Sequence, residues 1–427
     1  MAVIIYNVFL ALFRLGISLA SLWNRKAKLW LEGRKNIFER LNSELGTPHS
    51  ELIWMHCSSL GEFEQGRPVL EKLRSEYRGL KILLTFFSPS GYEIRKNYPG
   101  VDYVFYLPID STANAKRLFD IVNPRLVLFV KYEYWYYYIG ECKKRNVPLL
   151  MISAIFRKKQ PFFKWYGGLY RKMLRCFTHF FLQDENSKKL LQSVQINNIS
   201  VTGDTRFDRV SEIAETAEPI YIIEQFCAAQ KVFVAGSTWP ADESIIKKAI
   251  NSDSNLKLII APHEIHEKHL WELKSLFPGS ILFSQLTTHP AFAKASAGKH
   301  SQLTTHNCLI IDNIGMLSKL YRYATIAYIG GGFNNGIHNI LEAAVYGKPV
   351  IFGPEYMKFR EAVGLIQYGG GISIRNSREL RNCIVKLLTD TLYYEEMAKK
   401  SFEYVRINRG ATQMILNYIQ EKRLLTK

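Results

Sequence analysis

The chain has 427 residues, more than one ordinary core holds, and this length favours two large domains. Its 47% hydrophobic and 22% charged residues are close to globular averages and exclude a disordered protein. The formal charge of +18 favours an anionic partner, which can be nucleic acid, a phosphorylated small molecule or a membrane surface. No zinc-finger, RRM or helix-turn-helix signature supports nucleic acid. Six scattered cysteines without a C-x-x-C pair favour a reducing compartment.

Residues 3–23 form the only long apolar stretch, and the basic residues Arg25, Lys26 and Lys28 follow it at once. This order favours a membrane contact whose basic flank is cytoplasmic. The stretch can cross a hydrocarbon core of about 30 Å, although Arg14 near its middle costs roughly 2.5–3.5 kcal/mol there. A spanning helix and a helix lying in the interface both stay open, and the plain alternative is a helix packed on the protein's own core. A cleaved signal peptide is disfavoured. We predict a membrane anchor at 1–28.

Short apolar segments alternate with helical patterns over the rest of the chain. Strands buried on both faces have this composition, and their alternation with helices predicts an α/β fold with parallel sheets. We predict strands at 52–58, 81–87, 125–131, 148–154, 179–184, 231–237, 256–262, 308–313, 324–332 and 348–354. The series restarts after a hinge near 212–228, which predicts two Rossmann-like domains at 40–212 and 228–427. The hexapeptide SQLTTH occurs twice within 284–306, which we interpret as a loop insertion.

Two carboxylates follow predicted strands of the first domain. Glu62 lies in HCSSLGEFEQ after the strand at 52–58, and Glu133 lies in KYEYW after the strand at 125–131. Parallel sheets bind ligands beyond the carboxyl ends of their strands, and transfer to a hydroxyl group needs a base. Both residues are therefore candidate catalytic groups. The plain alternatives are that Glu62 stabilises a helix N-terminus and that Glu133 forms an ion pair with Lys131 or another cation.

One cation and one glycine-rich loop are candidates for binding phosphate. Arg206, in GDTRFDR, can neutralise charge on a leaving phosphate, and a surface ion pair is the alternative. The loop GGGFNNGIHN at 330–339 lies between a strand and a predicted helix, where backbone amides can approach a phosphate. It matches neither G-x-G-x-x-G nor a Walker loop, which disfavours a dinucleotide dehydrogenase and a P-loop ATPase. Glu342 can bind ribose hydroxyls, and the segment Pro262-His263-Glu264 can line the base.

Two further features have competing interpretations. His263, His266 and His269 lack the spacing of H-E-x-x-H, so we prefer helix-surface histidines to a metal site. Residues 156–175 combine Lys and Arg with aromatic side chains, which suits an anionic membrane interface. Base stacking on nucleic acid and an ordinary amphipathic helix are the alternatives for that segment.

Taken in order, HCSSLGEFEQ, KYEYW, GDTRFDRV, APHE and GGGFNNGIHNILEAAVYGKPVIFGP resemble the Kdo (3-deoxy-D-manno-octulosonic acid) transferase family of lipopolysaccharide synthesis. The resemblance covers essentially the whole chain. It implies the GT-B fold, with two facing Rossmann-like domains of which the first binds the acceptor and the second the CMP-sugar. It also implies a CMP-Kdo donor, a lipid IVA acceptor and an inverting reaction that needs no metal or other cofactor.

The same resemblance assigns roles to individual residues. Glu62 would be the general base, and Glu133 and Arg206 would support the transition state. The CMP contacts would fall on Pro262, His263, Gly315, Met316, Leu317, Gly336, Ile337, His338, Asn339 and Glu342. The chain departs from the family pattern at Tyr136-Tyr137-Tyr138 and at Ala343, which affects the acceptor more than the reaction class.

The expected activity is a single displacement at the cytoplasmic face of the inner membrane. Glu62 would deprotonate a hydroxyl of lipid IVA, which attacks the anomeric carbon of Kdo as CMP departs. The expected partners are CMP-Kdo, lipid IVA and the anionic membrane surface, without nucleic acid. Two rivals stay open: another GT-B enzyme that transfers or epimerises a UDP-sugar, and a non-catalytic peripheral protein that binds anionic lipid or nucleic acid.

Overall fold

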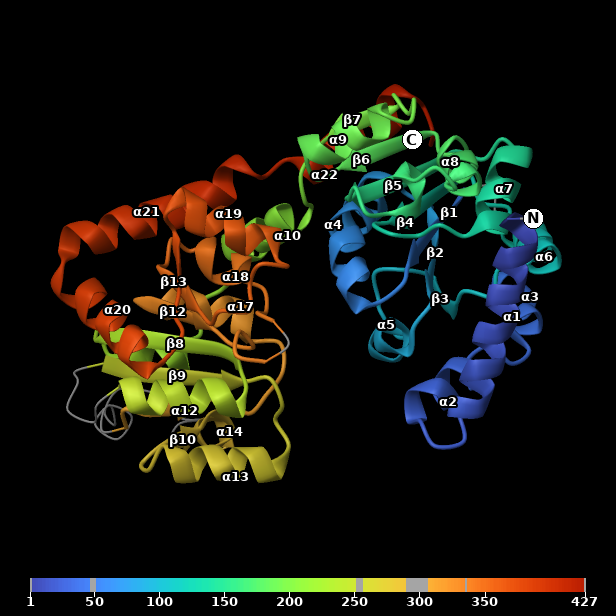
Figure 1. Cartoon of the computed structure of the whole chain (residues 1–427). Helices are drawn as coiled ribbons and strands as arrows, with labels where there is room; N and C mark the ends of the chain where they lie inside the picture. Colours follow the sequence, from blue (N-terminus) through green and yellow to red (C-terminus); the bar gives the residue numbers. More distant parts are fainter. Residues whose placement is uncertain (1, 47–50, 251–255, 289–305, 335, 426–427) are drawn as a thin grey trace. The chain divides into compact units, whose positions relative to one another are not determined.

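A computed structural model describes residues 2–46, 51–250, 256–288, 306–334 and 336–425. The chain divides into two compact units, one formed by Met1–Asp208 with Arg409–Lys427 and the other by Arg209–Asn408. Each unit contains one seven-stranded sheet in which every strand pair is parallel, and helices connect the strands (Figure 1). The predicted α/β fold with two parallel sheets is confirmed.

The first sheet has the strand order β3-β2-β1-β4-β5-β6-β7. All six residues of β1 and all five of β4 are buried, which explains their continuous apolar sequences. The register places His56 of β1 between Thr85 of β2 and Phe129 of β4. The strands are β1 (Leu52–Cys57), β2 (Lys81–Phe86), β3 (Tyr103–Tyr106), β4 (Leu126–Val130), β5 (Leu149–Ala154), β6 (His179–Leu182) and β7 (Ile199–Val201).

Helices cover both faces of this sheet. Helix α4 approaches it closely at Gly66, where an added Cβ would lie 2.8 Å from the sulfur of Met55 and 2.9 Å from a methyl group of Val130. Only glycine fits that contact. The helices of this unit are α1 (Ala2–Ala20), α2 (Arg25–Glu32), α3 (Ile37–Leu45), α4 (Leu60–Glu76), α5 (Pro89–Arg95), α6 (Thr112–Val122), α7 (Tyr136–Lys144), α8 (Gly168–Leu174), α9 (Glu185–Gln192) and α22 (Ala411–Glu421), with a 3-10 turn at Pro161–Phe163. Helix α10 (Arg206–Thr216) crosses the boundary between the units.

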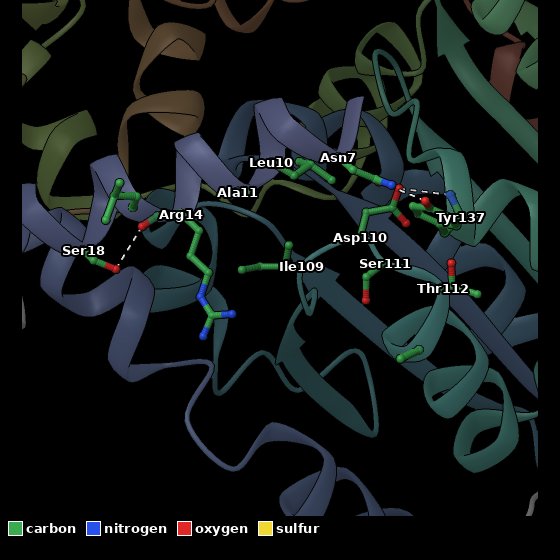
Figure 2. A pocket seen from close by; sticks show the side chains of 12 residues that line it. Asn7, Leu10, Ala11, Arg14, Ser18, Ile109, Asp110, Ser111, Thr112 and Tyr137 are labelled. Atoms are coloured by element: carbon green, nitrogen blue, oxygen red, sulfur yellow. Dashed lines mark hydrogen bonds between the residues drawn. The ribbon is translucent and has the colours of Figure 1, made fainter. Parts of the chain in front are cut away.

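Helix α1 is the one described helix that is long and apolar enough to cross a membrane, with a mean hydropathy of 2.0 and only 6% of its apolar window buried. The hydroxyl of Tyr6 donates to Asp110 across 2.6 Å, and the hydroxyl of Tyr137 donates to Asn7 across 2.9 Å. Between α1 and the segment 109–113 lies an open groove of about 630 Å³, into which the Arg14 side chain extends (Figure 2). Polar contacts therefore fasten α1 at its N-terminal end while most of its apolar surface stays exposed.

The second sheet has the order β10-β11-β9-β8-β12-β13-β14, so β9, β8 and β12 lie side by side at its centre. All seven residues of β9 are buried. The strands are β8 (Lys231–Thr238), β9 (Leu256–Pro262), β10 (Ile281–Leu282), β11 (Cys308–Ile310), β12 (Ile326–Ile329), β13 (Val350–Phe352) and β14 (Gly371–Ser373). Its helices are α11 (Tyr221–Cys227), α12 (Pro240–Ala249), α13 (Glu267–Leu276), α14 (Phe283–Thr288), α17 (Leu317–Leu320), α18 (Leu341–Ala344), α19 (Arg360–Tyr368), α20 (Ser377–Thr389) and α21 (Thr391–Ile407), with a 3-10 turn at Tyr321–Tyr323. Most of the predicted insertion at 284–306 lies outside the described residues.

The last helix, α22, returns to the first unit, although the sequence placed it in a domain at 228–427. Ile415, Leu416 and Ile419 are buried in the same core cluster as β1 and α4. The carboxylate of Asp208 accepts from the backbone N–H of Gly410 across 2.6 Å and satisfies the start of the helix. The apolar face of α22 packs against the core of the first unit. Because this contact joins residues far apart in the chain, the local sequence of α22 does not predict it.

Candidate active site

Glu62 is the third residue of α4, directly after the buried strand β1. Ser59 precedes the helix, and its hydroxyl donates to the Glu62 carboxylate. The S-x-x-E spacing is that of a capping box, but the Ser59 side chain makes no capping bond to the backbone. The carboxylate is half-buried and sits where the helix N-terminus favours negative charge. A base and a stabiliser of this helix can thus be the same residue.

Glu133 lies in the loop between β4 and α7 and is 3% exposed. One of its oxygens, Oε2, lies 2.9 Å from Nε2 of His56 and accepts from the Trp135 indole across 2.6 Å. Its hydrogen-bond partners are therefore His56 and Trp135, whereas the alternative interpretation from the sequence was an ion pair with Lys131 or another cation. The Trp135 ring packs on Phe87 at 4.7 Å, and Phe87 packs on Phe13 of α1 at 5.9 Å. A continuous aromatic contact joins the apolar helix to the loop that carries Glu133.

Arg206 begins α10 and forms an ion pair with Asp204, 2.8 Å from Nη2 to Oδ2. Asp204 also accepts from the side-chain amide of Gln65 across 3.0 Å, one helical turn after Glu62. Burial acts to raise the pKa of Asp204, but the charge of Arg206 and the hydrogen bonds from its side chain and backbone outweigh burial and lower it. Asp204 holds the Arg206 guanidinium in place, and about a quarter of the Arg206 side chain is exposed to solvent.

The buried thiol of Cys57, the last residue of β1, indicates how close the carboxylates lie. Burial raises its pKa well above the ordinary value, and the negative charges of Glu62, Glu133 and Glu64 add to that effect. Glu62 and Glu133 therefore lie around the carboxyl end of β1, where Gln65 also connects α4 to Asp204 and Arg206. All three candidate catalytic residues belong to this part of the first unit.

In the second unit, three rings stack at the carboxyl ends of the central strands. His263, after β9, stacks on Trp239, after β8, at 4.7 Å and on His338 at 4.4 Å. Burial lowers the pKa of His338 to about 4, and the charge of His263 acts in the same direction, so His338 is neutral at physiological pH. Pro262 is the buried last residue of β9, and His263 is exposed. Trp239 is not among the residues predicted from the sequence, although an aromatic residue directly after a strand and before Pro240 is a signal for such a position.

The glycine-rich loop is explained mainly by packing. An added Cβ at Gly330 would lie 2.2 Å from the carbonyl oxygen of Ser237, and one at Gly332 would lie 2.6 Å from Gly353. The amide of Gly331 donates to the Asp242 carboxylate across 2.9 Å, and the amides of Gly336 and His338 donate to carbonyl groups within the loop. In this conformation these three amides already have acceptors, which weighs against the sequence-based expectation that they bind phosphate.

The remaining donor-site candidates lie around the same strand ends. Gly315 adopts φ +98°, and α17 begins at Leu317. A Cβ at Gly236, near the end of β8, would lie 2.5 Å from Leu317, so this segment packs beside β8. Glu342, in the short helix α18, accepts from the side-chain amide of Asn339 across 3.1 Å. Ile337 is buried, whereas Met316 is half-buried.

The interpretation of His269 as a helix-surface residue is wrong. Its ring is 4% exposed, and Nε2 lies 3.0 Å from Glu243, which also accepts from the hydroxyl of Thr238 across 2.9 Å. The His269 side chain points from α13 toward α12, where Glu243 is its polar partner. His266 caps α13 through a bond from the His269 amide. Within the described ranges, no group of three or more His, Cys, Asp or Glu residues could hold a metal ion.

Comparison with known proteins shows which family the chain resembles. The family described as "3-Deoxy-D-manno-octulosonic-acid transferase (kdotransferase)" matches residues 35–209. Proteins named 3-deoxy-D-manno-octulosonic acid transferase are 24% identical in Rickettsia prowazekii (94% of this chain, 87% of the relative) and 28% identical in Aquifex aeolicus (79% and 86%). The chain is thus similar to Kdo transferases over most of its length. This similarity confirms the predicted glycosyltransferase class.

Solved structures agree on the fold. UDP-GlcNAc 2-epimerase from Neisseria meningitidis has a TM-score of 0.59 at 18% identity, covering 87% of this chain and all 100% of that one. MurG from Acinetobacter baumannii has a TM-score of 0.52 at 14% identity, covering 87% and 99%. These similarities concern architecture alone. Together with the two parallel sheets and the apolar N-terminal helix, they confirm the predicted GT-B fold.

Proposed function

We propose that this protein transfers Kdo from CMP-Kdo to a lipid A precursor, lipid IVA, with inversion at the anomeric carbon. The similarity to Kdo transferases and the GT-B fold support the donor and the reaction class. The observation that carries the proposal is the gathering of Glu62, Glu133 and Arg206 around the end of β1. This position, beyond the carboxyl ends of parallel strands, is where such folds bind ligands.

In this proposal Glu62 is the general base. It removes the proton from an acceptor hydroxyl, whose oxygen then attacks the anomeric carbon while the bond to the CMP phosphate breaks. One displacement on the face opposite the leaving group inverts the configuration. The Ser59 hydroxyl bonds to the carboxylate of Glu62 and holds it in place. Arg206, anchored by Asp204, supplies positive charge for an anionic group of a substrate.

The second unit would bind the CMP part of the donor. The stacked rings of His263 and His338 offer flat surfaces beside Pro262, and Glu342 with Asn339 offers polar groups for ribose hydroxyls. The segment Gly315 to Leu317 and the loop Gly336 to Asn339 complete the proposed site. We expect turnover to need no metal or other cofactor.

We also propose that α1 attaches the protein to the cytoplasmic face of the inner membrane. Its large exposed side chains are Ile4, Ile5, Val8, Phe9, Leu12, Leu15 and Leu19. Exposure of so many apolar groups on one helix is unfavourable in water and favourable in a bilayer. Trp165, which is 92% exposed within the basic segment 156–175, would contact the same headgroup region.

The decisive experiment incubates the full-length protein with in situ generated CMP-Kdo and lipid IVA, with and without EDTA, and counts added sugars by mass spectrometry. We expect wild type to form product in both conditions. Glu62→Gln should lower the rate by about 10²–10⁴-fold, because a base is lost while the volume is kept. The matched control is Glu76→Gln, an exposed residue at the far end of the same helix. A folded wild type that binds membranes but forms no product from CMP-Kdo would overturn the proposal.

A further inference from the structure

Four side chains, from β1, from β2 and from the loop after β4, form a continuous buried hydrogen-bond chain in the first unit. The indole N–H of Trp54 donates to the hydroxyl of Thr85 across 2.8 Å. The same hydroxyl lies 2.8 Å from Nδ1 of His56, and Nε2 of His56 lies 2.9 Å from Oε2 of Glu133. Trp54, His56 and Thr85 are each 0% exposed, and Glu133 is 3% exposed.

The direction of this chain follows from its first member. An indole nitrogen can only donate, so the Thr85 oxygen receives one hydrogen from Trp54 and is free to give its own hydrogen to a further partner. Nδ1 of His56 lies within reach of that hydrogen and accepts it in the tautomer that carries its proton on Nε2, which the Glu133 carboxylate, an acceptor only, also requires. The ring proton consequently lies on Nε2 and is donated to Glu133. Trp54, Thr85 and Glu133 together thus select one of the two neutral tautomers of His56.

The opposite tautomer fits poorly. It would donate from Nδ1 to the Thr85 carbonyl oxygen at 3.1 Å and turn the lone pair of Nε2 toward the carboxylate oxygen at 2.9 Å. Two acceptors would then face each other in a buried site, which costs free energy. The Trp135 indole N–H, 2.6 Å from the same Oε2 and 3.1 Å from Nε2 of His56, also finds its acceptor in Glu133.

Two donors therefore converge on Oε2 of Glu133. One is Nε2–H of His56 in β1, and the other is the indole N–H of Trp135, which lies in the same loop as Glu133. This arrangement fixes the direction of the carboxylate and occupies Oε2. Within the described part of the chain, Oε1 accepts no hydrogen bond, so it is the oxygen left for a substrate group.

We propose that His56 is a positioning residue, set in its Nε2–H tautomer by this hydrogen-bond chain, and that it orients Glu133 so that Oε1 faces the reacting groups. Glu133 is then the oriented carboxylate and Glu62 the proton acceptor. The assignment of this role in turnover rests on the proposed function, whereas the tautomer of His56 does not.

The first arm of the test is nitrogen NMR of the full-length protein with ¹⁵N-labelled histidine, the His56 signals being identified by their loss in His56→Gln. The expected result is a protonated Nε2 and an unprotonated Nδ1. Thr85→Val, which has the same shape without the hydroxyl, should lose this pure tautomer, and Thr85→Ser should keep it. A proton on Nδ1 in the wild type, alone or on both nitrogens, overturns the proposal whether or not the protein transfers Kdo.

The second arm measures Kdo transfer. Thr85→Val should lower kcat by about tenfold and leave KM for CMP-Kdo unchanged. The reason is that the hydrogen bond from Nε2 of His56 to the charged Glu133 carboxylate is weakened when His56 loses its Thr85 partner. Thr85→Ser should stay within about twofold of wild type, since it retains the hydroxyl. Trp135→Phe, at a half-buried position, removes the second donor and should also lower kcat. Unchanged kcat in folded Thr85→Val and Trp135→Phe overturns the role. A wild type that shows the Nε2–H tautomer but transfers no Kdo contradicts the proposed function and supports the hydrogen-bond chain.

Discussion

The indole Nε1–H of Trp239 donates a hydrogen bond to Nε2 of His338 across 3.2 Å. Because Nε2 accepts, the ring proton of His338 lies on Nδ1. The stacking of His263 on both rings holds this pair at the ends of the central strands of the second sheet. The three rings form the aromatic part of the proposed CMP site.

Trp239→Phe should weaken binding of CMP by about fivefold to tenfold, because the aromatic surface stays while the hydrogen bond that orients His338 is lost. Isothermal titration calorimetry with CMP measures this change. Trp271→Phe is the control, since Trp271 is 70% exposed on α13 of the same unit. Equal affinity in wild type and Trp239→Phe would remove these rings from the nucleotide site.

His338 also makes stability depend on pH. Its pKa is about 4 in the folded protein against 6.5 ordinarily, so between these values the unfolded chain binds a proton that the folded one does not. The free energy of unfolding therefore falls as pH is lowered through this window. His179, with a pKa of about 4, acts in the same direction, whereas Asp110, raised by burial to about 6, acts in the opposite one.

We expect His338→Gln to lose less stability than wild type when urea unfolding is compared at about pH 7 and about pH 4.5. The comparison of two proteins cancels the effects of His179 and Asp110, which both retain. Parallel pH profiles for the two proteins would show that protonation of His338 is not linked to folding.

Arg206→Gln should reduce both activity and stability. The variant leaves the buried Asp204 carboxylate with the Gln65 amide but without its cation. Removing one partner of a fully buried pair costs about 3–5 kcal/mol, and the partial exposure of Arg206 reduces our expectation to about 1–2 kcal/mol. Urea unfolding and the Kdo transfer assay give the two values.

Arg206→Lys separates charge from geometry at that site. Lysine restores the ion pair with one nitrogen but not the second bond from Nε, so stability should recover more than activity. The exposed Arg78, changed to Gln, serves as the control for loss of a positive charge near α4. Full activity of Arg206→Gln at normal stability would contradict a role in substrate binding.

Leu12→Ser combined with Leu19→Ser should lower binding to anionic lipid vesicles more than tenfold. The two side chains are 62% and 54% exposed, and full burial of each in a bilayer contributes about 1.5–3 kcal/mol. Vesicle co-sedimentation measures the effect. Leu392→Ser is the control, because Leu392 is 80% exposed but lies in the second unit. If the double variant binds vesicles as wild type does, α1 is not the anchor.

The sequence predicted the central strands of both sheets and missed four strands, β3, β7, β10 and β14, which are the four sheet edges. A central strand in a covered parallel sheet is buried on both faces and becomes a continuous apolar run. An edge strand has one neighbour and can be short and half-exposed. The three residues of β7 are all half-buried, and no apolar run marks them.

Candidate residues at strand ends could be predicted because parallel topology brings such ends together. Their partners could not. His56 belongs to the motif HCSSLGEFEQ, but no role could be predicted for it from the sequence. Its proposed role depends on the strand register that places Thr85 beside it. The engagement of the Gly331 amide by Asp242 likewise depends on a contact between segments 89 residues apart in the chain. Local sequence specifies which groups are available, and the tertiary fold decides which of them are already bound.

Helix α22 has a consequence for how the chain is made. The strands of the first unit are complete by residue 201, yet the core of that unit includes Ile415, Leu416 and Ile419. On the ribosome this core stays open while the whole of Arg209–Asn408 emerges, and that continuous segment can close its own core first. The unit synthesised first is therefore the one that finishes folding last, and it needs protection of its exposed apolar surface until the final helix arrives.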